Sequence, residues 1–151
     1  MEEAGAESRL FDEEELRFLA RVLRFSGEPQ ELRKALPSLT LQSYPAGASI
    51  IREGEIGTDV YVIVKGSVSI RRTRWLLFQH EIAKLSAGDF FGEISFLVPT
   101  ARSASVMAAA PAEIFRLVSE DLKNLLERFP GLRDKLEESA RERLFALARH
   151  S

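Results

Sequence analysis

The sequence contains no cysteine and only two histidines, and these shortages exclude several kinds of chemistry. Without cysteine the chain can form neither a disulfide nor a catalytic thiolate. His80 and His150 are its only histidines, which argues against a histidine-rich metal site. The lack of cysteine is also compatible with a reducing compartment, so we expect a cytoplasmic protein.

Long apolar runs and an excess of basic residues are missing as well. No apolar run approaches the roughly 20 residues of a membrane-spanning helix. The start of the chain lacks the basic-then-apolar order of a secretion signal. The formal net charge is -2, whereas a nucleic-acid surface favours a basic patch. We therefore expect neither a membrane span nor a nucleic-acid partner. Acidic residues instead crowd the stretch from Glu2 to Glu15, which we interpret as the solvated or frayed start of a helix.

What remains is typical of one folded domain with a core of its own. The 151 residues are 45% hydrophobic and 29% charged, ordinary values for a globular chain. Apolar residues at helical spacing predict a helix from Asp12 to about Phe25. Pro29 begins a second short helix, which Pro37 ends. We assign residues 1–38 to an N-terminal helical segment.

From Leu39 the pattern changes to short runs rich in valine and isoleucine, separated by glycine turns. Regular spacing of this kind predicts a β sandwich or barrel. The expected strands are residues 48–51, 60–64, 68–70, 82–85, 105–107 and 114–117. We assign residues 39–118 to this β-rich unit.

After Ser119 the pattern is helical again, which defines a third segment, residues 119–151. Ser119 followed by two acidic residues predicts a helix N-cap. Phe129-Pro130-Gly131 then interrupts the helical pattern, and a last helix follows. The apolar stripe of this last helix comprises Leu132, Leu136, Ala140, Leu144 and Leu147.

The stretch FFGEISFLVPTARSASV, residues 90–106, carries polar residues that do not fit a core. Gly92 to about Leu97 can form one helical turn, whose free N–H groups attract an anion. Arg102 supplies a forked cation suited to a phosphate. A carboxylate such as Glu93 is repelled by phosphate but accepts a hydrogen bond from a neighbouring sugar hydroxyl. Together these residues predict a clamp for a ribose phosphate.

The same stretch resembles the phosphate-binding cassette of cyclic nucleotide-binding domains, with its Phe-Gly-Glu start and its Arg-[Ser/Thr/Ala]-Ala-[Ser/Thr]-Val end. These motifs occupy residues 91–93 and 102–106 here. Residues 54–66 resemble the glycine-marked strand pair of that family. Two motifs at consistent separation, within a resemblance that covers roughly residues 43–129, make it specific, whereas Phe-Gly-Glu alone is weak.

The resemblance implies an α+β fold, in which an eight-stranded antiparallel, jelly-roll-like β-roll is flanked by N-terminal helices and two C-terminal helices. It implies that Arg102 pairs with a cyclic phosphate and that Glu93 binds the ribose 2′-hydroxyl. The other implied ligand-binding residues are Gly92, Ile94, Ser95, Ser103 and Ala104. The last helix becomes a mobile lid over the base, with Phe145 and Arg141 as candidate lid residues.

We therefore expect a regulatory sensor module that binds a cyclic nucleotide and couples binding to movement of its last helix. The expected ligand is cAMP, with cGMP as the alternative. Ser103 does not decide between them, because a hydroxyl after the arginine can touch a guanine in this family, yet serine also occurs in cAMP binders. We expect no cofactor, no metal and no enzyme activity, since neither histidine lies near a promising serine.

Two other functions stay open. The chain can be a protein-interaction roll that no longer binds nucleotide, although the intact Glu93 and Arg102 argue against this. It can also be the sensor part of a transcription regulator that lacks its DNA-binding domain, because no helix-turn-helix follows the last helix.

The run Trp75-Leu76-Leu77-Phe78 departs from the polar hairpin that is usual in the family. Four large apolar residues at a hairpin tip are costly if exposed. We expect them to fold back onto a flanking helix; the alternative is a contact patch for another subunit or domain. An effector domain or partner protein would dock on this run or on the C-terminal helix, and a homodimer stays open.

Overall fold

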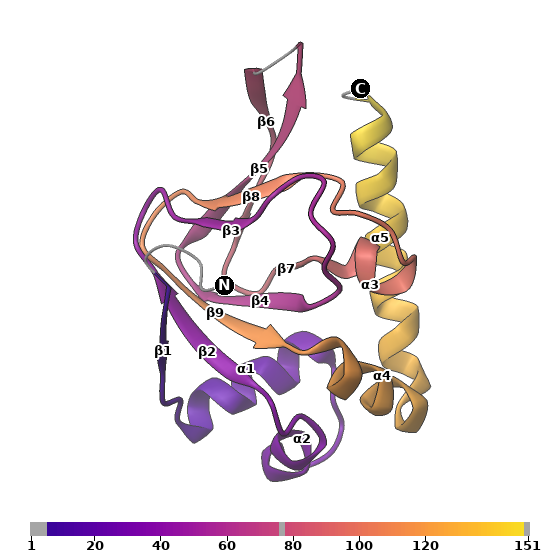
Figure 1. Ribbon diagram of the computed structural model, residues 1–151. Helices are drawn as coiled ribbons and strands as arrows, with labels where there is room; N and C mark the ends of the chain where they lie inside the picture. Colours follow the sequence, from indigo (N-terminus) through magenta and orange to yellow (C-terminus); the bar gives the residue numbers. More distant parts are fainter. Residues whose placement is uncertain (1–5, 76–77, 150–151) are drawn as a thin grey trace.

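The computed structural model describes residues 6–75 and 78–149, which form a β-roll with helices below it and along one side (Figure 1). The strands are β1 (Glu7–Arg9), β2 (Thr40–Tyr44), β3 (Ser49–Ile51), β4 (Val60–Lys65), β5 (Ser67–Arg74), β6 (Phe78–Ser86), β7 (Phe90–Phe91), β8 (Ser105–Ala108) and β9 (Ala112–Leu117). The helices are α1 (Glu13–Leu23), α2 (Pro29–Ala35), α3 (Glu93–Leu97), α4 (Ser119–Arg128) and α5 (Pro130–Arg149).

Two antiparallel sheets make up the roll. The five-stranded sheet has the order β1-β2-β9-β4-β7, and the four-stranded sheet has the order β3-β8-β5-β6. Strands β2 to β9 are the eight strands of the predicted roll, so the predicted fold class is confirmed. The short strands β2 and β7 were not among the strands expected from the valine and isoleucine pattern.

Strand β1 corrects the interpretation of the acidic start of the chain. Glu7 to Arg9 do not lead into a helix but pair antiparallel with β2. Arg9 explains this position, because it donates to the Glu113 carboxylate of β9 at 2.8 Å and forms an ion pair with Glu15 of α1. The division of the chain at residues 38 and 118 stays a prediction. Strand β1 lies before the first boundary, but it pairs with β2 beyond that boundary.

Strand β4 lies between two apolar cores, and this position explains why its sequence is apolar without interruption. Val60 and Val62 belong to the core shared with the helices, whereas Tyr61 and Ile63 belong to the core inside the roll. Successive residues of a strand point to opposite faces, so a strand buried on both faces carries no polar alternation. The helices therefore cover one face of the five-stranded sheet, and the four-stranded sheet covers the other.

The start of α4 differs from the sequence prediction. Ser119 is the first residue of the helix rather than its N-cap, and the N-cap Val118 offers no side-chain hydrogen bond. The Ser119 N–H instead donates to a carboxylate oxygen of Asp59 at 3.1 Å. A residue distant in sequence thus satisfies one of the unpaired donors of this helix end.

Helix α5 follows Phe129 and runs along one side of the roll, past α3 (Figure 1). Of its predicted apolar stripe, Leu132, Leu136, Ala140 and Leu147 are buried. Leu144 is the exception, since 46% of it is exposed. The stripe anchors the first half of α5 against the helical core, which contains Leu132 and Leu136.

The β5–β6 hairpin ends in exposed aromatic residues. Trp75 is 81% exposed and Phe78 is 76% exposed. The expectation that this run folds back onto a helix is therefore wrong for these two residues. Leu76 and Leu77 lie outside the described residues.

Candidate functional site

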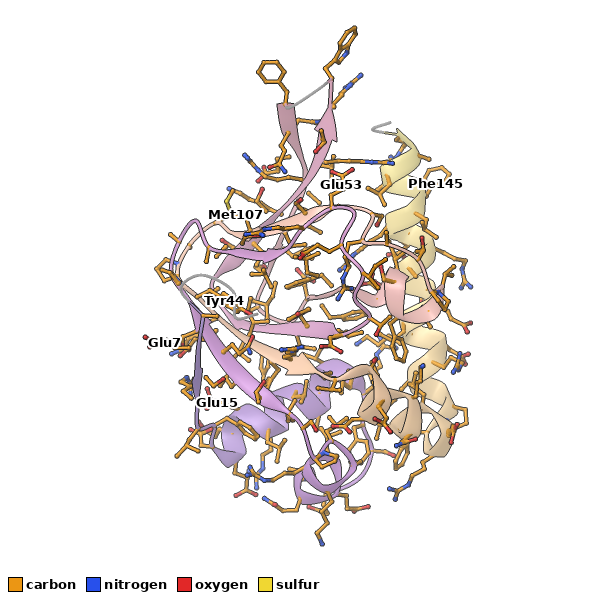
Figure 2. All side chains as sticks on the ribbon, in the orientation of Figure 1. Glu7, Glu15, Tyr44, Glu53, Met107 and Phe145 are labelled. Carbon is orange, nitrogen blue, oxygen red and sulfur yellow. The ribbon has the colours of Figure 1, made fainter. Side chains whose placement is uncertain are left out.

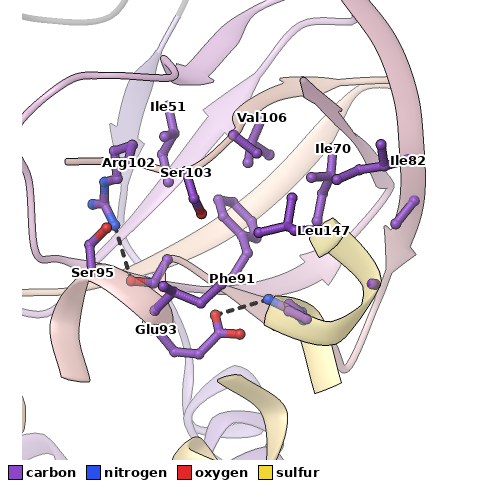
Figure 3. Close-up of a pocket in the computed structure, with 16 residues that line it drawn as sticks. Ile51, Ile70, Ile82, Phe91, Glu93, Ser95, Arg102, Ser103, Val106 and Leu147 are labelled. Carbon is purple, nitrogen blue, oxygen red and sulfur yellow. Dashed lines mark hydrogen bonds and ion pairs between the residues drawn. The ribbon is translucent and has the colours of Figure 1, made fainter. Parts of the chain in front are cut away.

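The residues predicted to bind a ligand meet in one cavity between the roll and α5 (Figure 3). All seven line it: Gly92, Glu93, Ile94, Ser95, Arg102, Ser103 and Ala104. The turn α3 carries the first part of this set, and the loop that leads to β8 carries the second. The structure thus brings together two groups of residues, 92–95 and 102–104, that are separated in the sequence by residues 96–101.

Gly92 is required at the start of α3 for two reasons. Its φ of +90° lies in the left-handed region, which side chains other than glycine rarely adopt. A Cβ atom at this position would also lie 2.7 Å from the carbonyl oxygen of Asp59. The sharp turn from β7 into α3, which places Glu93 beside the cavity, therefore depends on this glycine.

Arg102 is a buried cation that bonds to backbone oxygens. It is 7% exposed, and its two terminal nitrogens donate to the carbonyl oxygens of Gly92 and Asp59, both at 3.0 Å. Burial lowers the pKa of Arg102, opposed by the neighbouring charges of Asp59, Glu55 and Glu93. Within residues 6–75 and 78–149, no carboxylate forms an ion pair with this guanidinium. A buried charge of this kind favours an anionic partner.

Gly57 lies beside the Arg102 guanidinium, whereas the sequence analysis treated it only as part of a glycine-marked stretch. A Cβ atom there would lie 3.2 Å from Nε and from Nη2 of Arg102. The guanidinium therefore packs against a position that has no side chain. The available signal was the repeated glycine in Gly54-Glu55-Ile56-Gly57, which ends two residues before the buried strand β4.

Glu93 is almost fully buried and bonds to α5 through both carboxylate oxygens. The residue is 1% exposed. Arg143 donates to one oxygen at 2.9 Å, and the Ser139 hydroxyl donates to the other at 3.2 Å. Burial raises the pKa of Glu93 above its ordinary value, although the positive charge of Arg143 opposes the rise. The acid of the cassette is therefore also an attachment point for the last helix.

The face that α5 turns toward the cavity differs from the face expected. Arg143, Ala146 and Leu147 line the cavity, whereas the candidate lid residues Phe145 and Arg141 do not. Phe145 is 68% exposed and points away from the roll (Figure 2), and Arg141 is exposed as well. The structure thus does not bring these two candidates to the site.

A helical spacing could have identified the correct face. Ser139, Arg143 and Leu147 follow one another at intervals of four residues, so they share one face of a helix. Phe145 lies off the apolar stripe of the last helix, and a position off the stripe is as readily an exposed residue as a ligand contact.

An apolar wall completes the cavity. Ile51, Ile70, Ile82 and Val106, all from the four-stranded sheet, face the cassette across it (Figure 3). One side of the cavity therefore offers a cation and an acid, and the other offers aliphatic surface. This combination suits a small ligand that carries an anion, hydroxyl groups and an apolar ring.

Two further surveys of residues 6–75 and 78–149 bear on other functions. They contain no group of three or more histidine, cysteine or acidic side chains that could hold a metal ion. None of the helices formed by these residues is both long enough and apolar enough to cross a membrane.

The fold and its lining residues define a β-roll domain with a cavity between the cassette and the C-terminal helix. The family model described as "Cyclic nucleotide-binding domain" matches residues 41–129. This chain belongs to that family, and the resemblance drawn from the two sequence motifs is confirmed.

Individual relatives agree with this assignment. The cyclic AMP receptor protein of Thermus thermophilus is 34% identical over 102 residues, which are 68% of this chain and 47% of that protein. The regulatory domain of Toxoplasma gondii PKA, crystallised with cAMP, is 25% identical with a TM-score of 0.70, covering 85% of this chain and 49% of that one. The regulatory subunit of a cAMP-independent protein kinase A from Trypanosoma brucei is 26% identical with a TM-score of 0.68, covering 83% and 46%. This chain thus spans about half of the length of each.

The raised pKa of Glu93 predicts a pH dependence of stability. Because the folded protein holds the Glu93 proton more tightly than the unfolded chain does, this residue adds stability as the pH falls. We expect the parent protein to gain stability relative to Glu93→Gln as the pH falls from neutral through the raised pKa, with the gain complete below about pH 4. Urea unfolding of both proteins across this range measures the difference. A difference that stays constant, or that grows toward neutral pH, contradicts the raised pKa.

Proposed function

We propose that this chain is a cyclic nucleotide sensor in which Arg102 pairs with the cyclic phosphate and Glu93 accepts a hydrogen bond from the ribose 2′-hydroxyl. The observation that carries the proposal is the burial of Arg102 beside the carbonyls of Gly92 and Asp59, without a carboxylate in ion-pair contact among the described residues. A phosphate supplies the missing negative charge and accepts the remaining guanidinium hydrogens.

The base is proposed to lie between the apolar wall and α5. Ile70 and Ile82 offer aliphatic surface on one side, and Ala146 and Leu147 offer it on the other. A planar purine fits such a slot, because its faces are apolar and its edges carry the polar groups. Arg143, which lines the same cavity, replaces Phe145 and Arg141 as the proposed lid residue.

Binding is proposed to be coupled to the position of α5 through Glu93. A ribose hydroxyl that donates to this carboxylate has to share its oxygens with Ser139 and Arg143. Arg102 offers a second connection, because its partner Asp59 also bonds to the first residue of α4. Ligand binding would then shift the population of α5 positions, which an effector domain or partner protein reads.

We favour cAMP as the ligand. One relative described above is named a cyclic AMP receptor protein and another was crystallised with cAMP. Ser103 lines the cavity, without another lining residue that marks a guanine pocket. The protein-interaction roll is the second candidate, because the relative from Trypanosoma brucei is described as cAMP-independent.

Calorimetric titration of the full chain with cAMP, cGMP and 2′-deoxy-cAMP tests these assignments. We expect cAMP to bind most tightly. The affinity of the 2′-deoxy analogue should be lower than that of cAMP by about tenfold or more, because the analogue lacks one hydrogen bond to a charged acceptor. In Glu93→Gln this penalty should shrink, and Ser103→Ala should leave cAMP affinity unchanged while lowering any cGMP affinity. Absence of binding for all three ligands would favour the interaction roll instead.

A further inference from the structure

The outer part of the β5–β6 hairpin extends beyond the rest of the four-stranded sheet. Strand β8 pairs with β5 only from Val68 to Arg71, whereas the pairing of β5 with β6 continues to Arg74 and Phe78. Residues 72–75 and 78–80 thus form a two-stranded ribbon that projects from one end of the molecule (Figure 1). We refer to these residues as the distal ribbon.

The distal ribbon combines exposed aromatic side chains with positive charge. Trp75 is 81% exposed and Phe78 is 76% exposed, and Arg74 beside them is exposed too. The sequence from residue 72 to residue 80 contains Arg72 and Arg74 and no acidic residue. Arg72 lies 4.0 Å from the Glu53 carboxylate, so Arg74 is the arginine of the ribbon that is left to meet an anionic surface. This composition stands out in a chain whose formal net charge is -2.

The end of α5 adds to the same surface. Arg72 donates to the carbonyl oxygen of Leu147 at 3.3 Å, so the last turn of the helix lies against the base of the ribbon. On this part of α5 the exposed ring of Phe145 lies 5.3 Å from the Arg149 guanidinium. Glu15 and the other acidic residues at the start of α1 lie at the opposite end of the molecule (Figure 2).

We propose that the distal ribbon docks on the surface of an anionic lipid bilayer, with Trp75 and Phe78 in the interfacial layer and Arg74 at the headgroups. Tryptophan is enriched at membrane–water interfaces, because its ring is apolar and its N–H is polar. Arginine beside such a ring is attracted by anionic headgroups. Contact of this kind requires no membrane-spanning helix.

The size and shape of the tip favour a bilayer over a protein partner. Two aromatic side chains bury about 300–500 Å² together, whereas a stable protein interface buries about 800 Å² on each partner. A bilayer accepts a small aromatic contact, because lipids rearrange around Trp75 and Phe78 and Arg74 adds an electrostatic attraction. The expected binding is reversible, strengthened by anionic lipid and weakened by salt.

Trp75 is the only tryptophan of the chain, so its fluorescence reports directly on the tip. We expect its emission to shift to shorter wavelengths when the full chain is mixed with vesicles of equal parts phosphatidylserine and phosphatidylcholine at low salt. Vesicles of phosphatidylcholine alone should give a much smaller shift, and added salt should reverse the larger one. Vesicle co-sedimentation gives the affinity independently.

Variants with matched controls locate the contact. Phe78→Ala and Arg74→Glu keep the reporter and should weaken vesicle binding about fivefold or more. Leu10→Ala removes a side chain that is 92% exposed near the acidic end, and Lys123→Glu makes the same charge change on α4; both should bind like the parent.

Three results would overturn the proposal. The first is an emission spectrum that anionic vesicles leave unchanged. The second is equal loss of binding in the control variants. The third is a shift that depends on protein concentration without lipid, because the tip would then contact a second copy of the chain. None of these results bears on nucleotide binding, which titration with cAMP measures separately.

Discussion

Replacing Arg102 by alanine is expected to remove most of the affinity for a cyclic nucleotide. A hydrogen bond to a charged group contributes about 1.5–3 kcal/mol, and a phosphate left buried without its cation adds to the loss. We therefore expect binding to weaken by roughly tenfold to more than a hundredfold. Calorimetric titration measures this change, and the same titration of Arg52→Ala gives the control, since Arg52 is an exposed arginine in a nearby loop.

The structural role of Arg102 has to be separated from its role in binding. The same guanidinium holds the carbonyls of Gly92 and Asp59, so the alanine variant also loses two hydrogen bonds within the protein. Arg102→Lys keeps the charge without the planar fork, and we expect an affinity between those of the parent and the alanine variant. Urea unfolding of each variant shows how much stability is lost. If the alanine variant is folded and binds cAMP as tightly as the parent, Arg102 is not the phosphate ligand.

The roll and the cassette could be predicted because their signals are local in the sequence. Gly92, Glu93 and Arg102 belong to one short stretch, and the chemistry of each residue suggests its partner without knowledge of the fold. Six of the eight strands of the roll are similarly marked by runs rich in valine and isoleucine, and a glycine turn follows three of these runs. Residues of these types prefer strands and turns for reasons within a few residues of themselves.

The remaining features depend on contacts between distant segments, which the sequence alone does not reveal. Glu7–Arg9 form a strand because Arg9 meets Glu113, more than a hundred residues later. Ser119 begins α4 rather than capping it, because Asp59 supplies the acceptor. Arg143 reaches the cavity because Glu93 is buried directly beneath α5. In each case the deciding partner is a charged side chain whose position only the folded chain defines.

Replacing Arg143 by alanine is expected to lower the free energy of unfolding by about 2–3 kcal/mol at neutral pH. The change leaves the buried carboxylate of Glu93 with Ser139 as its remaining partner on α5. The expected loss is below the 3–5 kcal/mol typical of fully buried pairs, because the Arg143 side chain is 22% exposed. Arg141→Ala is the matched control on the same helix, and it should change stability by no more than about 0.5 kcal/mol, since Arg141 is exposed.

A double-mutant cycle shows whether this loss arises from the pair with Glu93. Glu93→Gln removes the carboxylate, so adding Arg143→Ala to it should cost much less than Arg143→Ala costs alone. The cost of Arg143→Ala should likewise fall at acidic pH, where the raised pKa of Glu93 allows this carboxyl to become protonated. Hydrogen exchange should be faster in residues 139–149 of the single variant than in the parent, and cAMP should slow it in the parent. If the two substitutions are additive and exchange in α5 is unchanged, the ion pair does not hold the helix, and the coupling proposed between Glu93 and α5 fails.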